Sequence, residues 1–280
     1  MKITLKNIMG HICAPFFIAA LLLPFPARAS FYGGAWNLES GDSDPTYLSE
    51  QIRQWATISV WGFSEVENQN VLTLLCNSLN DQNSSSRFVG ILGSTGRTDR
   101  LGVVFDQARF AYVTAYELPE TNLGNTLRAS LVVQLRELAT GEEFLFVANH
   151  LYRGKSSNET RRDLQAAALR EWAAAQTLPV IAVGDFNLDC DADNLAQCNN
   201  SYRVLTHSNV FTWVVPEDPI KTQCSRYNSI LDFVFVTSAA RGWASSSFIL
   251  NRDADACRDN DRKSDHRPIG AFFNTGKEEL

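Results

Sequence analysis

The segment Pro179-Val180-Ile181-Ala182-Val183-Gly184-Asp185-Phe186-Asn187 decides the fold, because an apolar strand in it runs directly into polar residues. Residues 179–183 are apolar and rich in β-branched side chains, which is typical of a buried strand. The same pattern recurs in four more segments that end on acidic, amide or histidine side chains: Trp36-Asn37-Leu38-Glu39, Ser64-Glu65-Val66-Glu67, Asn149-His150 and Ser264-Asp265-His266. Side chains capable of chemistry therefore recur at strand ends.

A sixth position of interest, Asp232, lies inside an apolar strand at 230–236. An ionised carboxylate there is costly unless it is paired, so Asp232 requires a partner. The other residues each have a structural alternative. Asn and Asp at strand ends are common turn formers, Glu65 is compatible with a solvated surface position, and single histidines are often structural. Each motif alone is weak evidence for catalysis, and only the combination carries weight.

Short apolar strands alternate with a few helices along the chain. Strands are expected at 31–38, 58–64, 88–92, 101–105, 111–117, 129–135, 144–148, 179–183, 230–236, 248–250 and 269–273. Helices are expected at 45–56, 69–80 and 156–175. Asp44 is the expected N-cap of the first helix, with Pro45 in its first turn. The apolar face expected for the third helix is Leu164, Ala168, Trp172 and Ala175. Many strands with few helices predict two packed sheets flanked by helices.

Residues 1–29 are typical of a signal peptide. Lys2 and Lys6 precede an apolar run at 12–25, and Ala27-Arg28-Ala29 offers small residues at the two positions that signal peptidase reads. The run is short for a spanning helix, which needs about 20 apolar residues, so cleavage after Ala29 is favoured over an uncleaved anchor. We expect residues 30–280 to form one domain that is secreted or periplasmic, with no stable membrane association.

The expected mature chain is acidic. Removal of Lys2, Lys6 and Arg28 with the leader leaves 22 basic and 31 acidic residues, a net charge of −9. Such a protein is not built for tight nonspecific binding of polyanions. A polyanionic substrate is still compatible with it, because a local basic rim or a bound cation reverses the sign of the charge in a cleft.

Five cysteines remain after the leader: Cys76, Cys190, Cys198, Cys224 and Cys257. An oxidising compartment favours disulfides, and the expected pairs are Cys190–Cys198 and Cys224–Cys257. Cys76 lies in an apolar stretch and is expected to be a buried thiol. The sequence leaves other pairings open.

Five segments together resemble the endonuclease/exonuclease/phosphatase superfamily, which includes deoxyribonuclease I, exonuclease III, neutral sphingomyelinases and inositol polyphosphate 5-phosphatases. They are Trp36-Asn37-Leu38, Ser64-Glu65-Val66, Gly184-Asp185-Phe186-Asn187, Leu231-Asp232-Phe233-Val234-Phe235 and Ser264-Asp265-His266-Arg267-Pro268. They occur in family order and at family-like spacing across the whole mature chain. The resemblance implies a four-layer α/β/β/α sandwich of two mixed β-sheets flanked by helices, with its active site where strand ends meet.

The resemblance also implies a metal site and a group that handles water. Glu65 would be the main carboxylate ligand, helped by oxygen atoms of Asn37 and Asp265. Such ligands suit Mg²⁺, with Mn²⁺ or Ca²⁺ as alternatives. Asp185 and Asn187 would orient or deprotonate the attacking water and hold the phosphate.

His266 is the second centre that the resemblance implies, in contact with the phosphate and with Asp232 as its carboxylate partner. This pairing would supply the partner that the buried Asp232 requires. A neighbouring carboxylate also favours the charged imidazolium and orients the ring.

His150 narrows the branch of the family. The deoxyribonuclease I and sphingomyelinase branches have His at this place, and the exonuclease III branch has Tyr. Asp99 matches the carboxylate that pairs with this His, although the pattern has Glu there. The shorter side chain leaves the pairing open.

Basic residues near His150 suggest contacts to a phosphodiester backbone. Arg128 resembles a phosphate-contacting Arg of the nuclease branch, and an exposed strand-end charge is the open alternative. Arg153, with Lys155, Arg161 and Arg162, is expected either to form a rim for the substrate backbone or to lie on the solvated face of a helix N-terminus.

These residues favour a nuclease that cuts DNA or RNA with Mg²⁺, and they indicate no protein partner. A phospholipase C-like sphingomyelinase is the first alternative. Its membrane-inserting segment would be Phe211-Thr212-Trp213-Val214-Val215, which is equally compatible with a core position. A soluble phosphomonoesterase is the second alternative. A catalytically dead binding module is the least favoured, because a decayed site should show gaps.

Overall fold

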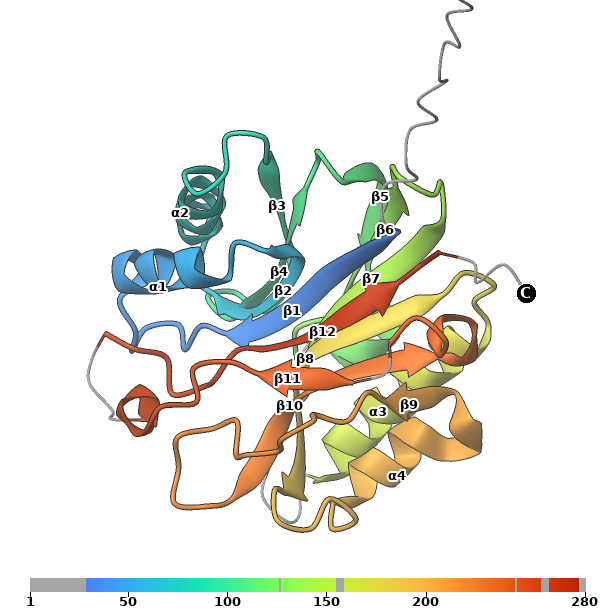
Figure 1. Ribbon diagram of the computed structural model, residues 1–280. Helices are drawn as coiled ribbons and strands as arrows, with labels where there is room; N and C mark the ends of the chain where they lie inside the picture. The colour runs from blue at the N-terminus through green and yellow to red at the C-terminus, as the bar shows by residue number, and fades with distance from the viewer. Residues whose placement is uncertain (1–28, 126, 155–158, 245, 258–261, 277–280) are drawn as a thin grey trace, which may run out of the picture.

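The computed structural model describes residues 29–125, 127–154, 159–244, 246–257 and 262–276. The expected signal peptide lies outside them except for Ala29, and so do Lys155 and residues 156–158, the start of the expected third helix. The described residues form two six-stranded sheets packed face to face, with helices on the outer faces (Figure 1). The structure therefore confirms the predicted four-layer sandwich.

The first sheet contains the N-terminal strands and has the order β11-β12-β1-β2-β4-β3. Its strands are β1 (Ser30–Asn37), β2 (Ile58–Val66), β3 (Phe88–Leu92), β4 (Arg100–Asp106), β11 (Ser247–Ile249) and β12 (Ile269–Asn274). β1 and β2 run parallel, and the other pairings in this sheet are antiparallel. The C-terminal ends of β1 and β2 therefore meet at one edge.

The second sheet has the order β5-β6-β7-β8-β10-β9. Its strands are β5 (Phe110–Glu117), β6 (Leu131–Glu137), β7 (Glu143–His150), β8 (Val180–Asp191), β9 (Phe211–Trp213) and β10 (Ser229–Thr237). β7 and β8 are its parallel pair, and β10 is antiparallel to β8. Both sheets are thus mixed, as expected.

Helices cover the outer face of each sheet (Figure 1). They are α1 (Pro45–Gln51), continued by a 3₁₀ turn (Ile52–Trp55), and α2 (Gln69–Asn80) on the first sheet, and α3 (Glu159–Ala174) and α4 (Asn200–Thr206) on the second. Asp44 caps α1 through its side chain, and Pro45 lies in the first turn, as predicted. Within the described ranges, every helix is too short or too polar to cross a membrane.

Three apolar cores separate the four layers. The central core joins the two sheets and includes Phe31, Phe146 and Val183. The other two lie between a sheet and its helices, with Leu72 of α2 in one and Leu169 of α3 in the other. Most strands of the middle layers are therefore buried, whereas the edge strand β5 is largely exposed.

Gly62 in β2 lets the two sheets approach closely. A Cβ atom at this position would lie 2.6 Å from Val183 Cγ2 and 3.3 Å from Ala148 Cβ across the central core. Protein interiors are close-packed, so a larger residue would force the sheets apart. The contact occurs just before the polar ends of β2, β7 and β8, which brings these ends together.

β8 is longer than the sequence predicts. The expected strand ends at Val183, but backbone pairing with β10 continues to Asp191. Asp185 and Asn187 therefore lie within a strand instead of a loop. The prediction ends the strand too early because the run of apolar residues stops at Gly184. The strand itself continues because backbone hydrogen bonding does not require apolar side chains. α4 and β9, of seven and three residues, are also absent from the predicted elements because such short segments show little periodicity.

The predicted apolar face of α3 is wrong except at Trp172, which packs against the core between α3 and the second sheet. Leu164 is 54 % exposed, whereas Leu169 is buried. Gln165 shares the buried face, because its Oε1 accepts a hydrogen bond from Tyr152 N and its Nε2 donates to Thr121 O, at 2.7 and 2.8 Å. Because Gln165 is polar, the spacing of apolar residues in the sequence does not identify the face of α3 that is buried.

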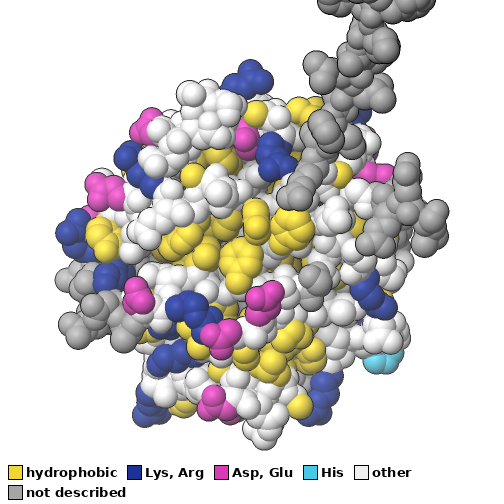
Figure 2. All heavy atoms as spheres, in the orientation of Figure 1, with side chains coloured by type: hydrophobic (Ala, Val, Ile, Leu, Met, Phe, Trp, Pro, Cys, Tyr) yellow, Lys and Arg dark blue, Asp and Glu magenta, His cyan; other side chains and the backbone are white. Residues whose placement is uncertain are grey.

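Aromatic side chains lie on the outer face of the first sheet beside the helices. Figure 2 shows hydrophobic side chains gathered over the strands β1, β12 and β11. Tyr32 packs against Phe272 and Phe248, with ring centroids 5.2 and 6.0 Å apart. These rings partly shield the strands that α1 and α2 leave uncovered.

Both expected disulfides are present, Cys190–Cys198 and Cys224–Cys257, and Cys76 is a buried free thiol. The second disulfide joins the segment before β10 to the segment before β12. Each of these strands leads to or from a residue of the site described below.

Replacing Cys224 and Cys257 together by serine is expected to lower the free energy of unfolding by roughly 4 kcal/mol, because the disulfide restricts the unfolded chain. The bond spans 33 residues. Chemical denaturation of the oxidised protein and the double variant measures the difference. The control is the Cys190→Ser/Cys198→Ser pair, which opens a span of 8 residues and should lose less stability. Equal losses in the two variants would contradict this account.

Candidate active site

Asp185 occupies the middle of the polar strand ends. His150 in β7 and Asp232 in β10 are its register partners on either side. All three side chains are buried, and His150 Nε2 lies 3.5 Å from Asp185 Oδ2. The register of β7, β8 and β10 thus brings together three residues that the sequence assigns to catalysis.

The first sheet contributes Asn37 and Glu65. Asn37, at the end of β1, donates from Nδ2 to Glu65 Oε1 at 2.9 Å and to Asp185 Oδ2 at 3.2 Å. One amide therefore connects carboxylates that belong to different sheets. The site lies where the two sheets meet at their polar ends.

Glu65 reaches the site because β2 is bulged. Its register with β4 shifts between Phe63 and Val66, and Glu65 has a φ of +55°. Asn187 in β8 also adopts a left-handed conformation, with a φ of +52°. This region is unfavourable for residues other than glycine and is found disproportionately at functional sites. Bulges beside active sites commonly redirect a side chain, as this one does for Glu65.

Gly184 allows Asp185 to lie against β7. Its φ is +126°, and a Cβ atom at this position would collide with the carbonyl oxygen of Asn149. Only glycine tolerates both the backbone conformation and the contact. The glycine before Asp185 thus has a steric function that the strand requires.

His266 and Asp232 form a buried pair, with Nδ1 and Oδ2 2.8 Å apart. Burial alone would lower the pKa of His266. Asp232, followed by Asp185 and Asp265, outweighs burial and raises this pKa to about 10. His266 is therefore an imidazolium near neutral pH, and its Nε2 lies 3.8 Å from Asp185 Oδ2. The partner that the sequence required for Asp232 is present.

The segment 264–266 is anchored on the end of β1. Ser264 Oγ donates to the carbonyl oxygen of Asn37 at 2.6 Å. Trp36 Nε1 donates to the carbonyl oxygen of His266 at 3.0 Å. Both hydrogen bonds are buried, so the position of His266 depends on β1 as well as on β10.

Asp265 joins the site to Gln223 and Arg153. Its Oδ1 lies 3.7 Å from His266 Nε2, and its Oδ2 accepts from Gln223 Nε2 at 2.8 Å. Its backbone N–H donates to Glu39 Oε2 at 2.7 Å. Arg153 Nη2 in turn donates to Gln223 Oε1 at 2.8 Å. Gln223 was not identified from the sequence, because it follows no recognisable strand end.

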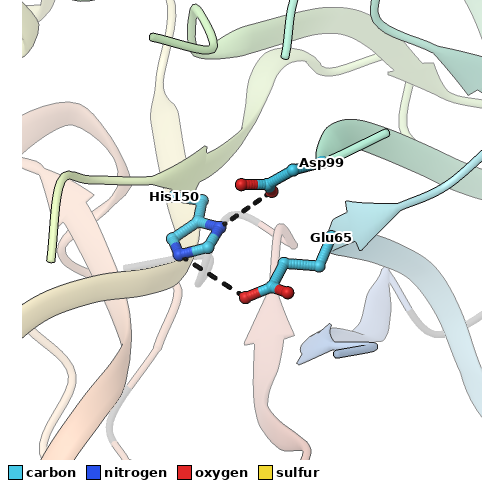
Figure 3. A group of neighbouring side chains, drawn as sticks. All are labelled: Glu65, Asp99 and His150. Atoms are coloured by element: carbon cyan, nitrogen blue, oxygen red, sulfur yellow. Dashed lines mark ion pairs between the residues drawn. The ribbon is translucent and has the colours of Figure 1, made fainter. Parts of the chain in front are cut away.

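His150 lies between two carboxylates, as Figure 3 shows. Its Nδ1 is 3.4 Å from Asp99 Oδ1 and its Nε2 is 3.9 Å from Glu65 Oε1. The structure thus places Asp99 beside His150, the pairing that the sequence left open. Burial, followed by the nearby Arg128 guanidinium, lowers the pKa of His150 to about 3, so this imidazole is neutral near pH 7.

Arg128 is held inside the site. Its Nη1 pairs with Asp99, and its Nε donates to the carbonyl oxygen of His150 at 3.0 Å. Its side chain is 14 % exposed, so the alternative of an exposed strand-end charge is wrong. Burial raises the pKa of Asp99 to about 6, although Arg128 acts in the opposite direction.

Asn187 lies behind Asp185. Its backbone N–H donates to Asp185 Oδ1 at 2.9 Å, and its Nδ2 donates to the carbonyl oxygen of Leu151 at 3.0 Å. Asn187 thereby orients the Asp185 carboxylate and fastens the loop after β7 to β8.

The basic residues after His150 have different environments. Arg153 is exposed beside the site, and the Arg161 guanidinium lies over the Tyr152 ring, 5.5 Å from its centroid. Arg162 is only 1 % exposed. A single solvated helix face is therefore the wrong description of this cluster.

Carboxylates outnumber positive groups in the site. The carboxylates are Glu65, Asp99, Asp185, Asp232 and Asp265. Among the described residues, Arg128 and charged His266 are the cationic groups that lie within 4 Å of these carboxylates. An anionic phosphate would be repelled by such a cluster unless a cation also bound there.

Two groups of ligand atoms lie close enough to hold a metal ion. Within each group the atoms lie within 4.8 Å of one another; the groups are Glu65, Asp99 and His150, and Asp185, Asp232 and His266. Oxygen atoms dominate both groups, as hard divalent cations prefer. The donor chemistry of the Glu65 group therefore fits a divalent cation, whereas the charged imidazolium of His266 has no lone pair to offer a metal ion.

Comparison with known proteins agrees with this geometry. The sequence model of the Endonuclease/Exonuclease/phosphatase family matches residues 34–266. A search of curated proteins found no match.

Solved structures share the fold at low sequence identity. A mannosyl-6-phosphatase from Bacteroides thetaiotaomicron has a TM-score of 0.61 at 16 % identity, covering 86 % of this chain and 98 % of the other. The catalytic domain of human Nocturnin, with bound sulfate, has a TM-score of 0.64 at 15 % identity, with coverage of 89 % and 96 %. D. rerio TDP2, complexed with a single-strand DNA product, has a TM-score of 0.63 at 16 % identity, with coverage of 88 % and 100 %.

Proposed function

The chain belongs to the endonuclease/exonuclease/phosphatase family, and from this premise we propose that it is an exported, divalent-metal-dependent phosphodiesterase that hydrolyses DNA or RNA. Members of this family are hydrolases of phosphoester bonds. The observation that carries the proposal is the position of Asp185. It lies between neutral His150 and the charged His266–Asp232 pair, and Asn37 connects it to Glu65.

Glu65, Asn37 and Asp265 are the proposed metal ligands. Asp99 is a weaker candidate than Glu65, because Arg128 already neutralises it. Asn37 Oδ1 accepts from Glu39 N at 3.0 Å, and a carbonyl oxygen has a second lone pair to offer a cation. When bound, Mg²⁺ would offset the negative charge that grows on the phosphate during attack by water. Mn²⁺ and Ca²⁺ are the alternatives with the same ligand preference.

Asp185 is the proposed base or orienting group for the attacking water. Burial raises its pKa, and charged His266 acts in the opposite direction. A carboxylate with a raised pKa accepts a proton more readily than a solvated one. Asn187 fixes its orientation through the backbone N–H bond to Oδ1.

The two histidines have different proposed roles. His266, held charged by Asp232, would donate from Nε2 to a phosphate oxygen. His150, neutral and beside Asp99, would act as a hydrogen-bonding group. When the environments of two titratable groups in one site give them very different pKa values, the two groups commonly have different functions.

Nucleic acid is the proposed substrate because of the charged groups beside the site. Arg153 lies exposed there and connects to Asp265 through Gln223. The membrane-inserting segment that a sphingomyelinase would need finds no support, since Phe211 and Trp213 are 1 % and 8 % exposed in β9. A soluble phosphomonoesterase is the second alternative.

Removal of divalent metal is expected to abolish hydrolysis, and added Mg²⁺ should restore it, because the carboxylate-rich site repels phosphate without a cation. Turnover of the purified mature protein with and without chelator measures this effect. The control is circular dichroism under the same conditions, which should show an unchanged fold. Full activity in excess chelator would contradict the metal dependence.

A side-by-side assay of plasmid DNA, RNA and sphingomyelin vesicles with Mg²⁺ tests the substrate class. We expect hydrolysis of nucleic acid and none of sphingomyelin. Hydrolysis of sphingomyelin alone would replace the proposal by the lipid alternative.

A further inference from the structure

A cavity of about 670 Å³ opens beside the proposed catalytic centre. Arg153, Arg162, Asp189, Gln223 and Tyr227 are among its lining residues. Gln223 connects it to the centre, because its side chain donates to Asp265 and its backbone forms a bridge with His266. Its volume is within the range of pockets that hold a small ligand.

Arg162 contributes a buried guanidinium to the wall of this cavity. It is 1 % exposed, yet it lines the cavity wall. Its Nε donates to Ser201 Oγ at 3.1 Å and its Nη1 to the carbonyl oxygen of Tyr152 at 3.3 Å. Among the described residues, no carboxylate forms an ion pair with Arg162. A buried guanidinium without a counter-charge is costly, and three of its five N–H groups remain for an anion.

Arg153 adds a second guanidinium on the same cavity. Its only hydrogen bond to a described residue is the one to Gln223. Two arginines that form no ion pair with a described carboxylate match a phosphate group, which accepts charge-assisted hydrogen bonds from both. The cavity wall is thus positive although the expected mature chain is acidic.

Tyr227 and Asp189 line the same cavity and offer contacts beyond those to a phosphate. The Tyr227 side chain is 56 % exposed, and the Arg226 guanidinium lies over its ring, 4.8 Å from the centroid, and donates to its hydroxyl. An exposed aromatic ring offers a platform on which a base can stack. Asp189 is an acceptor for an amino group of a base or a hydroxyl group of a sugar. Phosphate, planar ring and hydrogen-bond donors occur together in a nucleotide.

We propose that this cavity binds the nucleotide next to the scissile phosphate of single-stranded nucleic acid, with its phosphate on Arg153 and Arg162 and its base on Tyr227. The inference rests on the proposed phosphodiesterase function and specifies its substrate. A base in a duplex is stacked and paired, so only an unpaired nucleotide can present its ring to Tyr227. A choline headgroup carries a positive charge and would be repelled by both arginines.

The test compares two substrates of the holoenzyme with Mg²⁺. One is a single-stranded tetranucleotide, and the other is bis(p-nitrophenyl) phosphate, which has one phosphate and no neighbouring nucleotide. Arg153→Gln and Tyr227→Ala should each lower the ratio of kcat/KM for the tetranucleotide to kcat/KM for the small diester at least about tenfold. The matched controls are Arg87→Gln and Tyr112→Ala, both exposed and remote from the cavity, and their ratios should stay at the wild-type value.

Salt dependence adds a readout that a general loss of structure would not produce. Arg153→Gln should reduce the slope of log Kd against log[NaCl] for the tetranucleotide by about 0.7, the amount for one phosphate contact to a single strand. Arg162→Met should act in the same direction, with its thermal melting curve reported beside it because Arg162 also supports Ser201 and Tyr152.

The possible outcomes distinguish failure of the proposed nucleotide subsite from failure of the proposed phosphodiesterase function. Unchanged ratios in both Arg153→Gln and Tyr227→Ala would overturn the nucleotide subsite while leaving the phosphodiesterase intact. Faster hydrolysis of sphingomyelin vesicles than of the tetranucleotide would also overturn it. Failure to hydrolyse any phosphodiester would refute the proposed function. In that case, fluorescence anisotropy of a labelled tetranucleotide decides the subsite: weaker binding to Arg153→Gln supports it, and equal or absent binding overturns it.

Discussion

Asp185→Asn is expected to lower kcat at least about 100-fold, the usual loss when a proton-accepting or water-orienting group is removed. The substitution keeps the size of the side chain but removes the negative charge between His150 and His266. It also replaces one carboxylate oxygen by an N–H donor, which would face the donating Nδ2 of Asn37 or the backbone N–H of Asn187. Steady-state kinetics on a small diester and an oligonucleotide measures the effect.

The control for this variant is Asp106→Asn. Asp106 is also buried and also accepts backbone hydrogen bonds, from Arg87 and Ala108, but it lies at the far end of β4 from the site. It should lose stability and keep its turnover rate. Asp185→Ala is a second test, expected to show the same loss of activity at a greater cost in stability. Wild-type turnover in both Asp185 variants would refute the assignment.

His266→Ala is the second large effect, with an expected loss of at least about 100-fold in kcat. Near neutral pH His266 is the positively charged member of the His266–Asp232 pair. Its Nε2 lies 3.8 Å from Asp185 Oδ2 and 3.7 Å from Asp265 Oδ1. Alanine removes both this charge and the donor. His207→Ala is the matched control, because His207 is exposed at the end of α4 and should leave kcat unchanged.

Asp232→Asn shows whether the pair acts as a unit. The amide cannot hold the charged imidazolium, so this variant should lose activity to a similar extent as His266→Ala. The double variant should then be little worse than either single one, because residues that act together have non-additive effects. Additive losses would mean that Asp232 acts separately from His266.

Much of the fold was predictable from the sequence. The apolar runs before Asn37, Glu65, His150 and Asp185 are long enough to identify β1, β2, β7 and β8. Helices α1 and α2 were also predictable, from a capping residue and from the spacing of apolar residues. The failures have local causes: α4 and β9 are too short to show a period, and α3 buries Gln165 on its inner face.

The site was only partly predictable for a different reason. Residue types and strand ends pointed to Asp185, His266 and Asp232, and the basic cluster after His150 included Arg162, but Gln223 carried no signal. Gln223 matters because it joins Asp265 to Arg153, and Arg162 because it is buried and forms no ion pair with a described residue. Neither property can be seen in the residue's own neighbourhood along the chain.

The sequence by itself determined which strands exist, that their ends carry carboxylates and histidines, and which family they resemble. Local patterns can determine this because burial of an apolar face depends on residues close together in the chain. Segment 179–187 illustrates the limit. Its residues predict a buried strand that ends at Asp185, but not what Asp185 touches.

Only the tertiary structure decided those contacts. Strand register placed His150 and Asp232 on either side of Asp185, a bulge turned Glu65 toward Asn37, and the β1 end anchored His266. Each of these depends on hydrogen-bond pairing between residues far apart in the chain, where a shift of one residue turns a side chain to the opposite face. The sequence therefore supplied the reactive groups, and sheet packing determined the distances between them.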